Sequence, residues 1–166
     1  MQRGDVAFAC EGDVSFYGTF TYLAQAVQRL NGHVKISAIA GVSSPMAAAA
    51  AAHIPLTCQS DKLAILPALY SFNSGSNRRY DSCLDSQNEL EAALEWADVV
   101  ILMKVSSVYA QVWDILQRHQ LLERSVVIEN ATRADERVWI DLHNYPELKL
   151  PYFSLLIVQR ATRTVV

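Results

Sequence analysis

Cysteine is scarce in this 166-residue chain, and its three copies, Cys10, Cys58 and Cys83, lie far apart. An odd and scattered set does not make a disulfide framework, so we expect a reducing, cytoplasmic compartment. The cysteines and the four histidines also lack the close pairs that hold zinc. We therefore expect no metal site.

The chain also lacks a strong charge excess and a long apolar segment. Its 14 basic and 17 acidic residues give a net charge of −3, which offers no basic face for nucleic acid. The longest run of low polarity, Ala38–Ala52, contains Gly, Ser and Pro and is too short to cross a bilayer. With 51% hydrophobic residues the chain can still bury a core. We expect a globular protein with neither a nucleic-acid nor a membrane partner.

The first third of the chain has apolar runs on both sides of a helical pattern. Val6–Cys10 and Val34–Ile39 are short apolar runs between turn signals, which predict buried strands. Phe16–Leu30 carries apolar residues at helical spacing and is followed by Asn31-Gly32, a typical helix end. This order predicts a right-handed strand–helix–strand crossover. A further helix is expected from Pro45 through Ala52, capped by Ser44.

A second series of elements begins near Lys62. Alternating apolar runs and helical patterns predict strands at Leu63–Ala68, Val99–Met103, Val126–Ile128 and Pro151–Val158, and helices at Asn88–Trp96 and Ser106–His119. Val138–Leu142 is expected to be a short extended segment. The polar stretch Ser71–Ser86 predicts a mobile surface loop. We expect an α/β fold divided into residues 1–60 and 61–166, with the mobile loop at 71–86.

Small or polar loops follow several of these strands, which is where α/β proteins bind ligands. They are Gly12-Asp13, Gly41–Ser44, Met103-Lys104 and Asn130–Thr132. The first three also have a plainer interpretation: Gly12-Asp13 as a loop and helix cap, the alanines after Ser44 as good helix formers, Met103 as core and Lys104 as a salt-bridge partner. The residues alone predict an α/β domain with a cleft for a small molecule.

Five motifs carry a resemblance to a known family: Glu11–Phe20, Ala40–Ala49, Val99–Val105, Glu129–Thr132 and Lys149–Ser154. In this order they resemble the tetrapyrrole methylases, the S-adenosyl-L-methionine-dependent enzymes of cobalamin and sirohaem synthesis. The resemblance extends from about Val6 to Arg160. Within the family it is closest to the members that methylate C(20) of precorrin-2.

The resemblance implies two α/β subdomains with the ligand cleft between them, assembled as a homodimer. The reaction it implies is methyl transfer to precorrin-2, or to its metal-loaded form, in cobalamin biosynthesis. Family members begin upstream of the position of Val6 with a further strand and a Gly-Pro-Gly-Asp loop, so we expect the first subdomain to be incomplete. The alternative is a truncated, non-catalytic remnant that binds a tetrapyrrole or nucleoside, or serves dimerisation.

The resemblance also implies roles for individual residues. S-adenosyl-L-methionine would be held by Glu11, Gly12, Asp13, Phe16, Ser43, Ser44, Met103, Asn130, Ala131 and Thr132. The acidic tetrapyrrole would contact Tyr17, Lys104 and Arg133. Arg78 and Arg79 are further cationic candidates, although a solvated loop is the plainer interpretation of that pair. No residue in the sequence stands out as a catalytic base.

Overall fold

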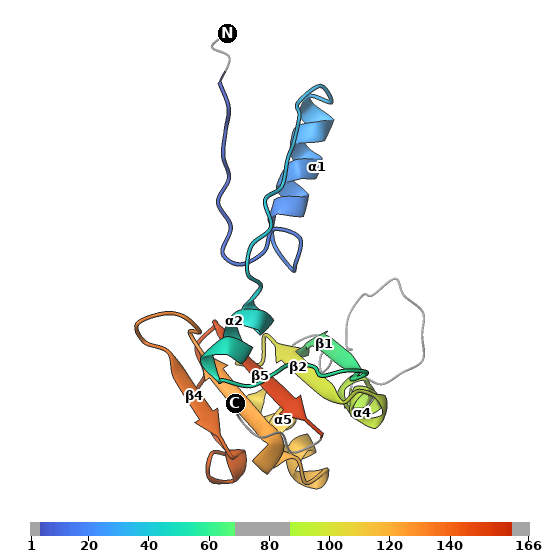
Figure 1. The fold of residues 1–166 in the computed structure, drawn as a ribbon, viewed down its shortest axis with the longest axis vertical. Coiled ribbons are helices and arrows are strands. Elements are labelled where there is room, and N and C mark those ends of the chain that lie inside the picture. The colour runs from blue at the N-terminus through green and yellow to red at the C-terminus, as the bar shows by residue number, and fades with distance from the viewer. Residues whose placement is uncertain (1–3, 69–86, 161–166) are drawn as a thin grey trace. The chain divides into compact units, whose positions relative to one another are not determined.

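The computed structural model describes residues 4–68 and 87–160 (Figure 1). The chain divides into two compact units, Met1–Met46 and Ala47–Val166. The loop predicted at Ser71–Ser86, with Arg78, Arg79 and Cys83, lies outside the described residues. The subdomain boundary predicted at residue 60 concerns the organisation of the family and stays a prediction.

The second unit is built on a five-stranded sheet in the order β1-β2-β5-β3-β4 (Figure 1). Its strands are β1 (Leu63–Pro67), β2 (Val99–Met103), β3 (Ser125–Glu129), β4 (Arg137–Ile140) and β5 (Ser154–Gln159). β1 is parallel to β2, and every other neighbouring pair is antiparallel. The four predicted strands of this unit are therefore confirmed, with ends that differ by a few residues, and the predicted extended segment at Val138–Leu142 corresponds to β4.

Both faces of this sheet are covered, because strand residues alternate between two apolar clusters. Val100 and Leu102 belong to the cluster that includes Leu90 of α4 (Gln87–Trp96) and Val112 of α5 (Tyr109–Arg118). The short helices η1 (Leu122–Arg124) and η2 (Leu142–Asn144) add Leu122 and Leu142 to this cluster. Within the described ranges, no helix is long and apolar enough to cross a membrane.

The opposite face of the sheet packs against α2 (Ser44–Ala51), the predicted alanine helix. Val99 and Ile101 of β2 share a cluster with Ala48 and Ala49, which are 0% and 6% exposed. Alanine side chains let the helix lie close to the sheet, where a larger side chain would not fit. The helix starts at Ser44 itself, so Ser44 is its first residue instead of the predicted cap.

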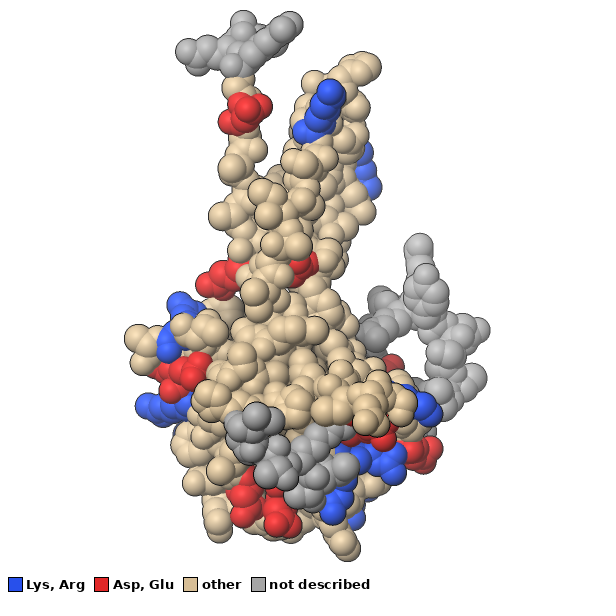
Figure 2. Space-filling view, in the orientation of Figure 1, with Lys and Arg blue, Asp and Glu red and all other residues tan. Residues whose placement is uncertain are grey.

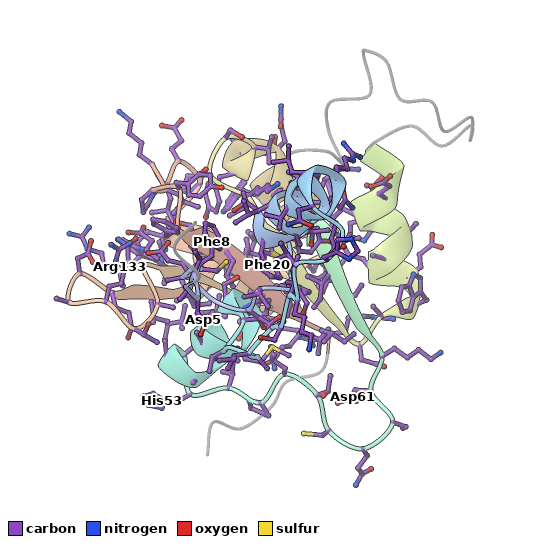
Figure 3. The ribbon with its side chains drawn as sticks, turned by 90° about the horizontal axis from the view of Figure 1, so that it is seen from above. Asp5, Phe8, Phe20, His53, Asp61 and Arg133 are labelled. Carbon is purple, nitrogen blue, oxygen red and sulfur yellow. The ribbon has the colours of Figure 1, made fainter. Side chains whose placement is uncertain are left out.

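The first unit contains α1 (Phe20–Leu30) and two extended segments. The strands predicted at Val6–Cys10 and Val34–Ile39 are wrong, and so is the crossover, because neither segment forms a strand. A strand needs a backbone partner as well as apolar side chains, and these runs make no ladder hydrogen bonds in the described part of the unit. Instead Val6 is 95% exposed, and the ring of Phe8 stacks on that of Phe20 at 6.3 Å (Figure 3).

α1 begins four residues later than its apolar spacing predicts, because a local turn precedes it. The Phe16 amide donates to the Asp13 carbonyl at 3.3 Å, and the Ser15 amide donates to the Asp13 carboxylate at 2.8 Å. Tyr17 then takes a left-handed conformation with φ 52°. An Asp side chain that bonds to the backbone two residues later competes with helix formation. α5 likewise begins after a turn, in which the Val108 amide donates to Val105.

The close packing of α2 on the sheet predicts a difference between two neighbouring alanines. Ala48→Leu should lower the free energy of unfolding by about 1–3 kcal/mol, because the added methyl groups have no space beside Val99 and Ile101. Ala50→Leu is the control, since Ala50 is exposed on the same helix and should change stability by less than about 0.5 kcal/mol. Urea denaturation of the two variants measures this. Equal stabilities would contradict the packing of α2 described above.

Candidate functional site

In the first unit, the loops predicted at Gly12-Asp13 and Gly41–Ser44 lie backbone against backbone. A Cβ atom placed on Gly41 would come within 2.2 Å of the Gly12 carbonyl oxygen. Gly12 itself has φ +78°, and a Cβ atom there would lie 3.5 Å from the Val42 carbonyl oxygen. Both glycines are therefore required, one for a close approach and one for a left-handed backbone.

The carboxylate of Asp13 joins these two loops. Its Oδ2 accepts the Gly41 amide at 2.8 Å, and its Oδ1 accepts both the amide and the hydroxyl of Ser15. The Ser15 hydroxyl, followed by the Gly41 amide, holds the pKa of Asp13 below its ordinary value. Asp13 is thus ionised at neutral pH and already has partners within its own unit. Its predicted contact with the methyl donor stays a prediction.

The other predicted residues of this unit lie on the same two segments. Phe16 is partly buried and packs edge-on against Tyr17, with ring centroids 4.9 Å apart, while Tyr17 is 54% exposed. The Ser43 hydroxyl donates to the Met46 sulfur at 3.0 Å. Glu11 and Ser44 are exposed. The structure brings these residues together on crossing loops, with the aromatic pair on the first.

In the second unit, the order of the strands brings the predicted residues to one edge of the sheet. β5 is antiparallel to both β2 and β3, so β2 and β3 run in the same direction. Met103 and Ile128 both pair with Leu155, which makes one row across three strands. Lys104 therefore follows one strand and Asn130 follows another at the same edge. The Asn130 amide donates to the Phe153 carbonyl at 2.8 Å, which extends the pairing of β3 with β5 beyond the ends of the two strands.

Three predicted residues at this edge have left-handed backbones. The φ angles are 56° at Lys104, 49° at Asn130 and 69° at Thr132. Asn adopts this conformation readily, but a β-branched Thr does so only where its surroundings enforce it. Here the Thr132 amide donates to the Glu136 carboxylate at 2.5 Å, and the Asn130 amide group donates to Asp135 at 2.8 Å. Such enforced conformations are common where loops carry function.

Met103 differs from the four residues before it in β2. Those residues are buried, whereas Met103 is only partly buried at the end of the strand. Strand alternation places it on the face of Val99 and Ile101, the face to which Ala131 also contributes. Partial exposure at a strand end favours the interpretation of Met103 as the wall of a site over that as plain core.

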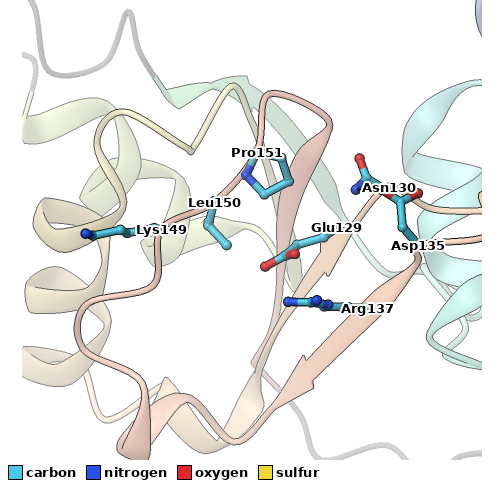
Figure 4. Close-up of a pocket in the computed structure, with 7 residues that line it drawn as sticks. All are labelled: Glu129, Asn130, Asp135, Arg137, Lys149, Leu150 and Pro151. Atoms are coloured by element: carbon cyan, nitrogen blue, oxygen red, sulfur yellow. Dashed lines mark hydrogen bonds between the residues drawn. The ribbon is translucent and has the colours of Figure 1, made fainter.

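The opposite face of the same edge holds a pocket that the sequence analysis missed. Glu129 is 7% exposed, and one oxygen of its carboxylate accepts the indole N–H of Trp139 at 2.8 Å. It borders an open cavity of about 410 Å³, lined by Glu129, Asn130, Asp135, Arg137, Lys149, Leu150 and Pro151 (Figure 4). The two acidic and two basic residues that line this cavity give it no net charge. Figure 2 shows that acidic and basic residues are also interspersed over the surface of this unit. The available signal was Glu129, an acidic residue directly after the apolar run Val126–Ile128.

The loop crossing predicts the effect of adding one methyl group at Gly41. Gly41→Ala should push the loops apart and break the hydrogen bond from residue 41 to Asp13. Carboxyl NMR should find the pKa of Asp13 below its ordinary value in the wild type and closer to that value in the variant, because the Gly41 amide no longer stabilises the carboxylate. Gly32→Ala is the matched control, because its nearest contact would be the Gln28 carbonyl oxygen at 3.8 Å. An unchanged pKa in Gly41→Ala would show that the loops do not meet as described.

Comparison with known proteins points to one family. Residues 1–143 match the family model described as Tetrapyrrole (Corrin/Porphyrin) Methylases. The chain is 30% identical over 156 residues to the cobalt-precorrin-2 C(20)-methyltransferase of Salmonella typhimurium, covering 93% of this chain and 58% of that protein. It is also 30% identical over 165 residues to the probable cobalt-precorrin-2 C(20)-methyltransferase of Methanocaldococcus jannaschii, covering 98% and 62%. The chain thus spans about three fifths of these relatives.

Solved structures show the same fold at lower identity. The cobalt precorrin-4 methyltransferase CbiF aligns with a TM-score of 0.65 and 20% identity, covering 89% of this chain and 61% of that one. The methyltransferase CobJ aligns with a TM-score of 0.65 and 19% identity, covering 93% and 64%. The uroporphyrin-III C-methyl transferase of Thermus thermophilus, solved with S-adenosylhomocysteine, has a TM-score of 0.54 and 14% identity, covering 90% and 63%. With its α/β fold and the matching family model, this chain belongs to the tetrapyrrole methylases.

Proposed function

We propose that the chain transfers a methyl group from S-adenosyl-L-methionine to C(20) of precorrin-2, or of its cobalt-loaded form, in cobalamin biosynthesis. The observation that carries this proposal is the 30% identity, over 93% of the chain, to an enzyme named for that reaction. The activity is a proposal for this chain, because the chain spans 58% of that enzyme.

The described residues fit the chemistry of the methyl donor. A sulfonium ligand with a flexible methionine tail needs apolar walls, a few backbone partners and a carboxylate or hydroxyl. Met103 offers a partly exposed, unbranched thioether, which adapts to such a tail. The crossing loops offer exposed backbone at Gly12 and Gly41, beside the ionised carboxylate of Asp13. Asn130–Thr132 would contact the donor from the second unit.

Once bound, the donor supplies an electrophilic methyl group, so the protein has mainly to orient two reactants and exclude water. We assign the substrate contacts to Tyr17, Lys104 and Arg133. Arg133 offers positive charge to the carboxylates of a tetrapyrrole, and Tyr17 offers an exposed ring. The proposal includes a homodimer, the assembly that the family resemblance implies. It also includes a location in the cytoplasm.

A second candidate is a non-catalytic protein that binds a tetrapyrrole or a nucleoside. It is favoured by the exposed apolar residues of the first unit, such as Val6 and Ile39, at 95% and 87% exposure. Neither of the extended segments that carry them is paired in a sheet. A half-site on the second unit alone could then retain binding without transfer.

Binding and turnover together separate these candidates. S-adenosylhomocysteine should bind in calorimetry and raise the melting temperature through mass action. With S-adenosyl-L-methionine and either precorrin-2 or cobalt-precorrin-2, the product should gain the mass of one methyl group. Binding without a mass gain would favour the second candidate. Absence of any binding to S-adenosylhomocysteine would overturn the proposed methyl transfer.

Two neighbouring residues of β2 should respond differently to truncation. Met103→Ala should weaken the affinity for S-adenosylhomocysteine by about tenfold, the loss of part of a buried apolar contact, with little loss of stability. Leu102→Ala is the control, because Leu102 is 0% exposed and packs on the opposite face. It should cost about 2–5 kcal/mol of stability and leave the affinity of the folded protein unchanged. Unchanged affinity with a large stability loss in Met103→Ala would make Met103 a core residue.

A further inference from the structure

We propose that Phe153 and Arg133, with Tyr152 beside them, form a platform that binds a ring face and a carboxylate of the tetrapyrrole substrate. This inference rests on the proposed function and names residues that select its substrate. We call the three residues the Phe153 platform.

The first observation is a cluster of exposed aromatic rings with a cation. Tyr152 is 72% exposed and Phe153 is 45% exposed, and their rings meet edge to face with centroids 5.2 Å apart. The guanidinium of Arg133 lies 5.1 Å from the centre of the Phe153 ring. Arg133 projects from the turn that follows β3 (Figure 3). A single exposed aromatic residue is ordinary, but two rings with an arginine stacked on one of them make a defined surface.

The second observation is that the backbone beneath the platform is firmly held. The Phe153 carbonyl accepts the Asn130 amide at 2.8 Å, which ties the start of β5 to the end of β3. The Ser154 hydroxyl donates to the Pro151 carbonyl at 2.8 Å and closes the turn that carries both rings. The Arg133 amide donates to the Asn130 carbonyl at 3.0 Å. A platform fixed on sheet ends loses little freedom when a ligand stacks on it.

The third observation is the position of the platform at the sheet edge. Phe153 directly precedes β5, whose second residue, Leu155, pairs with both Met103 and Ile128. The platform therefore lies at the same edge as Met103 and Asn130–Thr132, the predicted donor residues of this unit. A ligand on the rings would be a neighbour of these residues, as the acceptor of a methyl group must be.

The charge of the platform favours the tetrapyrrole over the adenine ring of the donor. Both ligands have flat conjugated parts that can stack on Phe153. The donor has a single carboxylate, which sits beside an amino group on its methionine tail, away from the adenine. The tetrapyrrole carries several carboxylates on side chains around its ring system, where a guanidinium beside the stacked ring can bind them with charge-assisted hydrogen bonds. In the described ranges, the guanidinium of Arg133 makes no ion pair, so the ring of Phe153 orients it while its N–H groups remain available.

The test uses uroporphyrin III, a stable coloured porphyrin with carboxylate side chains, as the probe. Its affinity is measured from the change in its Soret absorption, and that of S-adenosylhomocysteine by calorimetry on the same proteins. Phe153→Leu and Arg133→Gln should each weaken porphyrin binding by about fivefold and leave S-adenosylhomocysteine binding unchanged. Trp96→Leu is the control, because Trp96 is 52% exposed at the end of α4, three residues before β2 begins at the opposite edge. It should change neither affinity.

The outcomes separate this inference from the proposed function. If the wild type binds both ligands and the platform variants match it, the inference is overturned and the proposed function stands. If Phe153→Leu weakens S-adenosylhomocysteine instead of the porphyrin, the platform serves the donor and the inference is also overturned. If the wild type binds neither ligand, the proposed function fails and the inference fails with it.

Discussion

The insertion of β5 between β2 and β3 is the constraint on which the candidate site of the second unit depends. All six residues of β5 are buried, and backbone hydrogen bonds hold it on both sides. Because β5 runs opposite to both neighbours, it brings the carboxyl ends of two strands to one edge. Met103 and Asn130 are 27 positions apart in the chain, yet both lie beside the beginning of β5, Met103 opposite Leu155 and Asn130 bonded to Phe153.

Strand alternation then gives this edge two chemically different faces. Met103, Ala131 and the cluster under α2 lie on one face, where partly buried apolar groups prevail. Glu129 and Trp139 lie on the other, beside a cavity with balanced charges. Neighbouring residues such as Leu102 and Met103 can therefore differ in role, because they lie on opposite faces of β2. Asn130, at the end of β3, borders the cavity together with Glu129.

The sequence predicted the second unit well and the first unit poorly, for a physical reason. In β2 and β5 the apolar runs are also buried strands, so composition and structure agree. At Val6–Cys10 and Val34–Ile39 the same pattern failed, because pairing depends on a distant backbone that composition does not describe. The position of β5 in the sheet was likewise unpredictable, since it is set by non-local pairing. The late start of α1 depended on a local turn held by the backbone and side chain of Asp13, which residue type alone does not reveal.

Asp13 was predicted to contact the methyl donor, but its carboxylate also has a structural role, which is to join two loops. A carboxylate has about four positions that accept hydrogen bonds, and Asp13 uses three for Ser15 and Gly41. A ligand could take the remaining position, but the same carboxylate would still join the two loops. Removing Asp13 would therefore disturb Gly12 and Gly41 together with any ligand contact. Substitution of Asp13 would therefore mix two effects, the loss of the loop contact and the loss of a ligand contact. Gly41→Ala, compared with Gly32→Ala, changes the contact between the loops and leaves the Asp13 side chain in place.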